Sequence, residues 1–326
     1  MTLTREEMVS RETPPFRPVS ACWVCGGARL VAAWSDPFTL ADLPRFGDRA
    51  RGEYPRSVVM RCRSCGFGQP RELPPWPDYF STLYAIEQSP ESLRAAFETE
   101  GRDDIIQLAL SRLERLIAPD RRGSARWLDV GCHVGRLIAL ARRAGWNAEG
   151  VEINPVTAGY AAERTGARVR ALAVEDLDPN DPDERFDVIT MLDVLEHVPD
   201  PVPTVTRLRA LLRPGGVLMI KVPHGPPQMA KEWLRRALLR APEATSGVMV
   251  RYVHVNHFTA KSLKEMARRA GFAASGTVVD VAPPERAPTR LGQLGRVLVY
   301  RSAALPPPAL ASRLPWSFHL VLIARA

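Results

Sequence analysis

The pattern that most constrains the fold of this chain is a regular alternation of short apolar runs and helix-like segments after residue 125. Strand-length apolar runs recur between segments whose apolar residues repeat with helical spacing. Such alternation predicts a mostly parallel sheet covered by helices, with a ligand site beyond the carboxyl ends of its strands. The predicted strands are residues 127–130, 148–152, 167–172, 186–192 and 217–222, then a late pair at 275–281 and 318–324; the predicted helices are 136–144, 157–164, 204–212 and 261–270.

The first predicted strand ends in a glycine-rich turn, Asp-Val-Gly-Cys-His-Val-Gly at 129–135, which opens directly into a helix. Glycines at such a turn let backbone amides approach a ligand closely. Glu152 closes the second strand 21 residues after Gly131, at the distance where a carboxylate binds both ribose hydroxyls. Asp129 would repel the pyrophosphate of a dinucleotide, but it suits the ammonium and sulfonium groups of S-adenosylmethionine. The turn therefore favours S-adenosylmethionine over NAD.

With these segments in place, residues 126–222 resemble a class I S-adenosylmethionine-dependent methyltransferase. The matching segments, in the expected order, are 128–132, 151–155, 186–189, 192–201 and 211–216. The resemblance implies an α/β, Rossmann-like seven-stranded methyltransferase sheet with one late antiparallel strand. It also implies site roles: Gly131, Cys132 and Gly135 line the methionine side near Asp129, Glu152 with Ile153 takes the ribose, Glu175 or Asp176 lies near the adenine, and Leu192 lies beside the methionine moiety. His133 stands where the family usually has glycine, so its side chain either points away from the cofactor or reaches the substrate site.

Four of the five cysteines form two Cys-x-x-Cys-Gly units, Cys22/Cys25 and Cys62/Cys65. Two intervening residues let each pair of thiolates face one ion, and the following glycine permits the tight turn. The pattern predicts a structural Zn²⁺ site with four sulfur ligands. A redox pair and unligated core cysteines are the alternatives. The predicted organisation is a flexible tail at 1–20, a zinc-ribbon module at 21–75, a helical linker at 76–122 and a methyltransferase domain at 123–326, with insertions at about 224–250 and 282–315.

The order of ribbon, proline-rich connector and core resembles bacterial sugar C-methyltransferases and related natural-product or glycan methyltransferases. In that group a Glu-His pair before a late helix supplies the base. Here the pair reads Asn256-His257. The resemblance therefore implies His257 as the base, acting on a small-molecule, sugar or lipid-linked glycan acceptor, while the missing glutamate leaves O-methylation as open as C-methylation. A structural role for His257 is the alternative.

A second interpretation concerns Asp193, Glu196 and His197, whose spacing puts them on one face of a helix that starts after the fourth strand. Together with His257 they resemble the divalent-cation site of small-RNA 2′-O-methyltransferases and quinone-biosynthesis O-methyltransferases. In those enzymes the ion binds and acidifies the acceptor hydroxyl. Metal-free relatives share much of this motif, so a second possibility is that His197 packs beneath the substrate site without a cation.

Charge and hydropathy narrow the remaining functions. The formal net charge is +8, and no apolar run approaches the roughly 20 residues of a membrane span. The acidic first residues differ from a signal peptide, so we expect a cytoplasmic protein.

Residues 229–240 predict a basic amphipathic helix that caps the substrate, packs on the core or rests on an anionic membrane, making the protein membrane-peripheral. The ribbon lacks the interleaved aromatic and basic residues expected for stacking and phosphate contact, so RNA binding or modification is a weaker alternative, as is a non-catalytic scaffold. The oligomeric state is not predicted.

Overall fold

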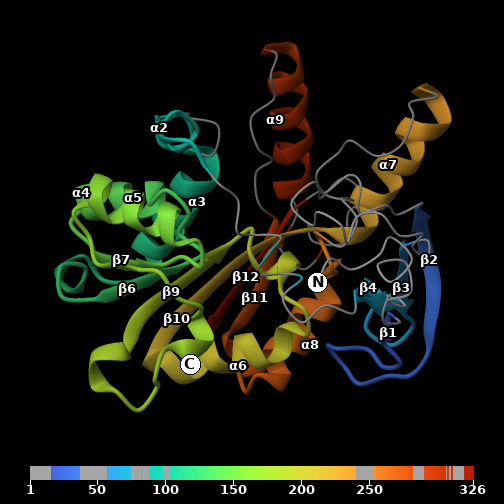
Figure 1. Cartoon of the computed structure of the whole chain (residues 1–326), viewed down its shortest axis with the longest axis horizontal. Coiled ribbons are helices and arrows are strands. Elements are labelled where there is room, and N and C mark those ends of the chain that lie inside the picture. The colour runs from blue at the N-terminus through green and yellow to red at the C-terminus, as the bar shows by residue number, and fades with distance from the viewer. Residues whose placement is uncertain are drawn as a thin grey trace, which may run out of the picture.

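The computed structural model describes residues 16–36, 57–74, 79, 82, 88–98, 103–239, 253–281, 290–305, 307, 310 and 319–326. Its centre is a seven-stranded sheet with the order β11-β12-β10-β9-β6-β7-β8. The strands are β6 (Arg126–Val130), β7 (Asn147–Val151), β8 (Val169–Arg170), β9 (Phe186–Leu192), β10 (Leu212–Pro223), β11 (Thr277–Val281) and β12 (His319–Arg325). Only β12 among them runs antiparallel to its neighbours, which confirms the predicted α/β sheet with one late antiparallel strand (Figure 1).

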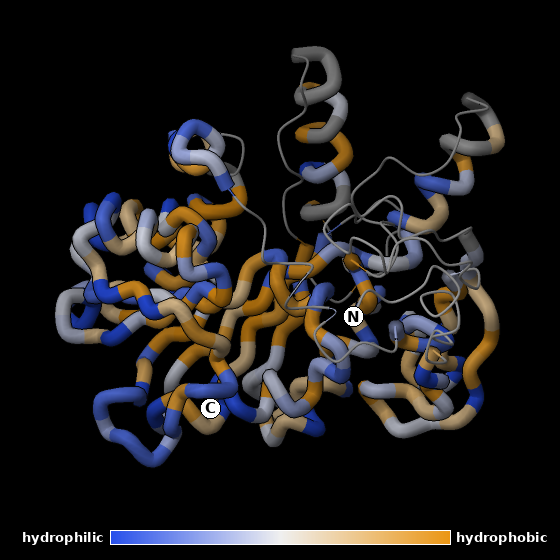
Figure 2. Tube along the Cα trace, viewed as in Figure 1, coloured by the Kyte–Doolittle hydropathy of each residue, from blue (hydrophilic) through white to orange (hydrophobic). Residues whose placement is uncertain are grey.

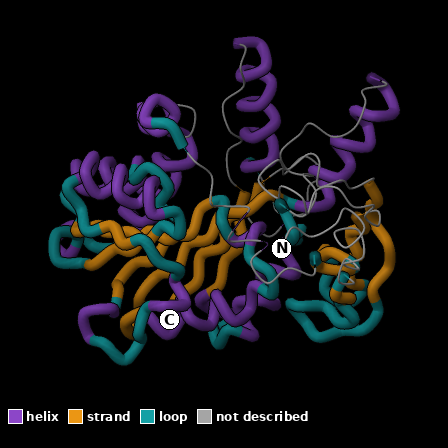
Figure 3. Tube along the Cα trace, viewed as in Figure 1, coloured by secondary structure: helices purple, strands orange, loops and turns teal. Residues whose placement is uncertain are grey.

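Helices cover both faces of this sheet (Figure 3). The helices are α2 (Pro90–Glu98), α3 (Asp103–Leu116), α4 (Arg136–Arg143), α5 (Pro155–Thr165), α6 (Pro201–Leu211), α7 (Gly225–Leu239), α8 (Ala260–Arg269) and α9 (Arg290–Ala304). Alternate residues of one strand point to opposite faces. In β6, Leu128 joins the core shared with α6 and α8, whereas Trp127 joins the core shared with α3 and α4. Figure 2 shows the resulting apolar layer along the strands.

Two predicted strands differ in length from the observed ones. The third strand was predicted at 167–172, but β8 is limited to Val169–Arg170, an edge strand that pairs with only two residues of β7. Conversely, β10 starts at Leu212, before the predicted 217, because Leu212 already pairs with Phe186 and the register then shifts to Val217. That irregularity accommodates the Pro-Gly-Gly turn, in which Gly215 has a positive φ of 75°.

The N-terminal module contains small antiparallel sheets. Strands β2 (Leu30–Asp36), β3 (Ser57–Cys62) and β4 (Gly68–Pro70) form one sheet, and β1 (Arg17–Pro18) pairs with β5 (Glu72–Leu73). The antiparallel pairing of β2 with β3 joins the two described parts of the interval between the cysteine pairs, and residues 37–56 of that interval lie outside the described residues. Residues 1–15 of the predicted tail, and residues 240–252, 282–289 and 311–318 of the predicted insertions, lie outside the described residues.

The module docks against the segment that precedes α8. Gly68 and His257 exchange two backbone hydrogen bonds of 2.9 Å, and Phe67 packs on Phe258 with ring centroids 5.2 Å apart. Thr259 donates its hydroxyl to the carbonyl of Cys65 at 3.1 Å. A side chain at position 68 has no room, because its Cβ would lie 2.9 Å from the Cβ of His257. The cysteine module therefore shares a tightly packed joint with the main domain.

Within the described part of the chain, no helix is both long and apolar enough to cross a membrane.

We predict that Gly68→Ala lowers the free energy of unfolding by about 1–3 kcal/mol, because the new methyl group overpacks this joint. Gly159→Ala is the matched control, since a Cβ on this α5 glycine meets nothing within 4 Å. It should stabilise the protein by about 0.5–1 kcal/mol through a less flexible unfolded chain. Urea denaturation of both variants measures the difference, and equal stability of Gly68→Ala and wild type would contradict the joint.

Candidate active site

The glycine-rich turn lies between β6 and α4 and closes against the next strand. Gly131 has a positive φ of 69°, and its amide donates to the carbonyl of Val151 at 2.9 Å. A Cβ on Gly131 would lie 2.4 Å from the side chain of Val194. Glycine is therefore required here twice, by the left-handed backbone and by the close approach of the turn that follows β9.

Asp129 is buried at the end of β6 and is held by a chain of hydrogen bonds. The hydroxyl of Thr190 donates to its carboxylate at 2.6 Å, and the indole of Trp127 donates to that same hydroxyl at 2.9 Å. Burial raises the pKa of Asp129 to about 7, and the nearby charge of Glu152 acts in the same direction, while the Thr190 hydrogen bond opposes them. Among the described residues, no cation contributes to the pKa of Asp129 and so favours its ionised form.

Glu152 is fixed in place by backbone donors. Its carboxylate accepts from the amide of His133 at 3.0 Å and from the amide of Asn154 at 3.1 Å. Asn154 in turn caps α5, accepting from the amides of Val156 and Thr157. His133 adopts a positive φ of 50°, a conformation that L-residues rarely take and that aims its amide at Glu152. The carboxylate is therefore preorganised before any ligand arrives.

A cavity of about 1040 Å³ lies at the carboxyl ends of β6, β7 and β9. Most of the predicted cofactor residues line it, together with one predicted catalytic histidine: Asp129, Gly131, Cys132, Glu152, Ile153, Glu175, Leu192 and His197. His133 also lines it, which places this departure from the family pattern at the site. The apolar walls contributed by α2 and α3, including Ala95 and Ile106, were not predicted, because their sequence shows only an amphipathic helix.

Gly135, Asp176 and His257 are not among the lining residues. Gly135 has a packing role instead, since its Cβ would lie 2.8 Å from Thr165 in α5. Asp176 accepts from the amide of Ala173 at 3.2 Å and so caps the 3-10 helix η5 (Val174–Asp176). Of the two candidates for the adenine side, Glu175 is the one that faces the cavity, where it accepts from the hydroxyl of Thr204 at 2.5 Å.

The structure corrects the predicted helix after the fourth strand. Asp193 has a positive φ of 57°, and only the 3-10 helix η7 (Leu195–His197) follows it, so Asp193 does not share a helical face with Glu196 and His197. Asp193 instead pairs with the buried ammonium of Lys221 on β10. This long-range ion pair could not be read from local spacing.

A different histidine completes the group at this turn. One ligand atom each from Glu196, His197 and His254 lies within 4.8 Å of the others. The sequence instead predicts His257 as the histidine that joins Glu196 and His197 in a cation site. The rings of His197 and His254 meet edge to face, with centroids 4.5 Å apart. Nδ1 of His197 lies 2.9 Å from the carbonyl oxygen of Val253, and because a carbonyl only accepts, Nδ1 is the donor of this hydrogen bond. Burial lowers the pKa of His254, which keeps its imidazole neutral and able to act as a ligand.

The Asn256-His257 pair has a visible structural role. The side-chain amide of Asn256 donates to the carbonyls of Leu195 and Val198 at 2.7 and 2.6 Å, holding η7 in place. A glutamate carboxylate could not donate either bond, which explains why the family's acidic residue does not fit here. His257 is buried at the joint with Gly68, and burial lowers its pKa to about 4. Its role as a base stays a prediction.

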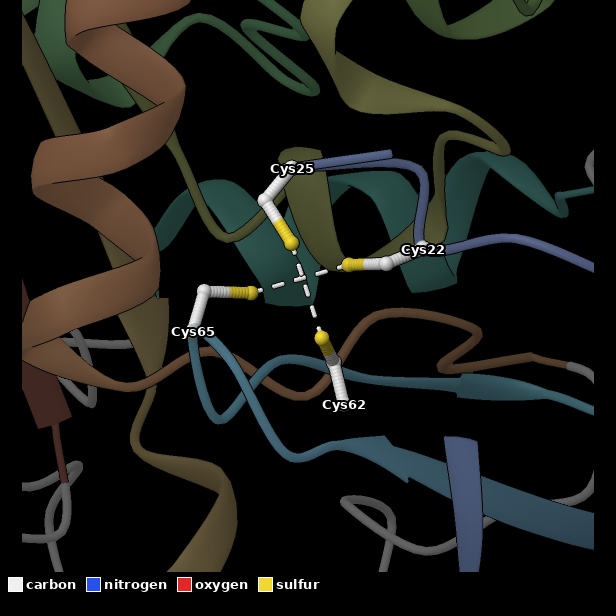
Figure 4. Close-up of side chains that lie close together, drawn as sticks. All are labelled: Cys22, Cys25, Cys62 and Cys65. Carbon is white, nitrogen blue, oxygen red and sulfur yellow. Dashed lines mark hydrogen bonds between the residues drawn. The ribbon is translucent and has the colours of Figure 1, made fainter. Parts of the chain in front are cut away.

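The four predicted metal-binding cysteines converge on one point (Figure 4). The sulfurs of Cys22 and Cys65 lie 3.6 Å apart, and those of Cys25 and Cys62 lie 3.5 Å apart. These separations far exceed a disulfide bond of about 2.05 Å. They approach the roughly 3.8 Å between two sulfurs that each lie about 2.3 Å from one tetrahedral ion. Both knuckle glycines, Gly26 and Gly66, adopt the positive φ that the tight turns require.

Comparison with known proteins identifies the domain around this cavity. A family model described as a methyltransferase domain matches residues 102–275, which is more than half of the chain. The chain belongs to the methyltransferase domain family. Its domain is of the class I, S-adenosylmethionine-dependent type that the resemblance implied.

Several relatives illustrate the range of similarity. The "Ubiquinone biosynthesis O-methyltransferase" of Actinobacillus pleuropneumoniae serotype 7 (strain AP76) is 39% identical over 99 residues, which cover 28% of this methyltransferase and 42% of the relative. The protein of the same name from Cereibacter sphaeroides (strain ATCC 17025 / ATH 2.4.3) is 30% identical over 176 residues, covering 51% and 67%. The methyltransferase thus spans about half the length of the curated relatives it matches.

Among solved structures, magnesium protoporphyrin IX methyltransferase (ChlM) from Synechocystis PCC 6803 with bound SAM is 15% identical, with a TM-score of 0.45 over 77% of this methyltransferase and 98% of that chain. An S-adenosylmethionine-dependent methyltransferase from Archaeoglobus fulgidus is 16% identical, with a TM-score of 0.43 over 69% and 97%.

We predict that S-adenosylmethionine binding at about pH 6.5 releases protons from Asp129. The free carboxyl, with its pKa near 7, is mostly protonated at that pH. A cofactor ammonium beside it favours the charged form and lowers this pKa, so cofactor affinity should rise as the pH increases from about 5 to about 7.

Calorimetry in buffers of different ionisation enthalpy measures the released protons. Asp129→Asn should abolish the release, whereas Asp176→Asn, a carboxyl outside the cavity lining, should leave it intact. Unchanged proton release in Asp129→Asn would show that another group titrates.

Proposed function

We propose that this methyltransferase transfers the methyl group of S-adenosylmethionine to a hydroxyl oxygen of a small-molecule acceptor. The observation that carries the proposal is that one cavity is lined both by the carboxylates suited to the cofactor, Asp129 and Glu152, and by His197 of the Glu196–His197–His254 group. The name of the curated relatives, ubiquinone biosynthesis O-methyltransferase, supports an oxygen acceptor. The largely apolar walls near Ile106 and Val198 suit an acceptor with an apolar body rather than a bare sugar.

Different residues of the chain would bind the methyl donor and remove the proton in such a transfer. Glu152 is positioned to bind the ribose, and Asp129 to bind the ammonium, so the methyl donor is held at the sheet edge. Methylation of a hydroxyl requires removal of its proton. We assign His197 to this step: because Nδ1 is engaged with the carbonyl of Val253, Nε2 is the ring nitrogen that acts, either as the base that takes the proton or, with the cation inferred below bound, as a ligand of that ion. His257, outside the cavity lining, acts on this site through Asn256, which holds η7.

We infer further that Glu196, His197 and His254 hold a divalent cation. Their ligand atoms lie close enough to share one ion. Nδ1 of His254 is buried and has no hydrogen-bond partner among the described residues, as expected of a nitrogen kept for another ligand. One carboxylate and two imidazoles suit ions such as Zn²⁺ or Mn²⁺. A cation bound here would bind the acceptor oxygen and lower the pKa of its hydroxyl.

The four cysteines are proposed to hold a separate, structural Zn²⁺. Four thiolates close the coordination shell of a tetrahedral ion, so this metal stabilises the module rather than taking part in the reaction. The sulfurs belong to the same core as Phe67, and the joint with His257 follows directly from the second cysteine pair. The metal thus contributes to the position of the segment that carries His254, Asn256 and His257.

We predict that His197→Ala lowers kcat at least tenfold and leaves S-adenosylmethionine affinity within about twofold of wild type, because His197 acts on the acceptor and not on the donor. Transfer of labelled methyl groups to a panel of phenolic, prenylated phenolic and sugar acceptors measures the turnover. His257→Asn is the comparison, since it tests the base predicted from the sequence. A loss of turnover in His257→Asn with cofactor binding and thermal stability intact, and none in His197→Ala, would overturn this assignment and restore the route through His257.

We predict that metal analysis of the purified protein finds zinc that Cys62→Ser removes. The variant should also lose several kcal/mol of stability, because the binding energy of a structural zinc ion is folding energy. Cys132→Ser, a buried cysteine outside the cluster, is the matched control and should keep its zinc. A zinc content that is the same in Cys62→Ser as in the control would contradict the four-cysteine site.

A further inference from the structure

Two helices leave the sheet at the same edge as the cofactor cavity. Helix α7 begins at Gly225, directly after the carboxyl end of β10, and α9 follows β11, which runs parallel to β10. In Figure 1 both helices project away from the sheet on one side of the molecule. Neither helix is needed to cover the sheet, whose faces are already packed by α3, α4, α6 and α8.

Both helices expose large apolar side chains. On α7, Trp233 is 64% exposed and its neighbour Leu234 is 50% exposed. Along α9, Leu294 and Leu298 lie one turn apart and are 61% and 66% exposed, and Leu305 follows directly after the helix at 84%. We call these five residues the docking face. Single exposed leucines are ordinary, but each of these two projecting helices exposes at least two large apolar side chains, which indicates a contact with something else.

Both helices carry a net positive charge in their sequences. Lys231, Arg235 and Arg236 belong to α7, and Arg290, Arg296 and Arg301 belong to α9. The only acidic residue in either helix is Glu232, which is buried. Lys231 and Arg301 are exposed, so cationic and apolar side chains occur together on both helices.

We propose that the docking face binds the surface of an anionic lipid bilayer. A helix that lies in a membrane interface combines an apolar face with a basic one, and tryptophan favours the boundary between headgroups and acyl chains. Trp233, Leu234 and the α9 leucines supply the apolar contact, and the exposed side chains of Lys231 and Arg301 complement acidic headgroups. An anionic bilayer therefore matches both the apolar character and the positive charge of the docking face.

A second copy of the chain would match the apolar character of the docking face but not its positive charge. In a symmetric dimer the same patch meets itself, so each basic helix would face another basic helix without acidic partners. Like charges brought together in this way oppose association. An anionic bilayer presents the complementary charge over the whole face, which is why the lipid surface is the occupant favoured by these residues.

The position of the docking face also determines how the cavity would be oriented relative to a membrane. The cavity and the two helices share the carboxyl edge of the sheet, so a protein held by α7 and α9 directs that edge toward the bilayer. An apolar acceptor dissolved in the membrane could then reach the site without crossing bulk water. The membrane contact itself does not depend on the proposed O-methylation, and its test uses no acceptor.

Co-sedimentation with lipid vesicles tests the proposal. The wild-type protein should bind vesicles of phosphatidylcholine mixed with phosphatidylglycerol, bind pure phosphatidylcholine vesicles much more weakly, and lose affinity as salt is raised. Trp233→Ser combined with Leu298→Ser should reduce binding at least tenfold. Lys231→Gln combined with Arg301→Gln should reduce the preference for anionic vesicles. The matched control, Val156→Ser combined with Val278→Ser, changes two exposed apolar residues outside the docking face and should bind like wild type.

Calorimetric binding of S-adenosylmethionine shows that each variant is folded. Equal vesicle binding by the Trp233/Leu298 variant and the control, or no binding of anionic vesicles by wild type, would overturn the proposal. So would sedimentation velocity showing a lipid-free dimer that the Trp233/Leu298 substitutions dissociate, because the face would then be covered by a second copy.

Discussion

The parallel pairing of β6 with β7 and β9 is the constraint on which the site depends. Val130 stands opposite Val151 on one side and Met191 on the other, so all three strands end at the same level. A residue placed just at or beyond each of these ends must therefore face a common space. Asp129, Glu152 and Asp193 occupy these positions. The cavity therefore depends on the pairing that brings the three strand ends together, and not on any one of these residues.

The cysteine module is coupled to this space through one short segment. Gly68 fixes His257, Asn256 holds the η7 turn through two carbonyls, and that turn presents Glu196 and His197. His254 lies in the same segment and completes the group with Glu196 and His197. A shift at the module would thus move Glu196, His197 and His254 and not merely a distant surface, so the zinc site proposed for the four cysteines would have a physical means of affecting the reaction.

Features set by neighbouring residues could be predicted from the sequence, and features set by distant residues could not. The strand ending in Asp129, the glycine turn, Glu152 and the cysteine knuckles are local patterns, and the structure contains each of them. The turn after β9 was predicted as a helix, because the spacing of 193, 196 and 197 contains no sign of Lys221, whose ammonium holds Asp193 from the next strand. The grouping of His254, rather than His257, with Glu196 and His197 has the same origin, since the backbone contact with the distant Gly68 holds His257 at the joint.

The distribution of charge reconciles a cationic protein with a cationic cofactor. A net charge of +8 repels S-adenosylmethionine at long range. At physiological ionic strength, however, charges separated by more than about 8 Å are largely screened. Asp129, Glu152 and Glu175 line the cavity itself, so three acidic groups lie close to where the cofactor would bind. The surplus of basic residues lies elsewhere in the chain, and the basic sequences of α7 and α9 account for part of it, where the proposed bilayer contact would use many charges against one extended anionic surface.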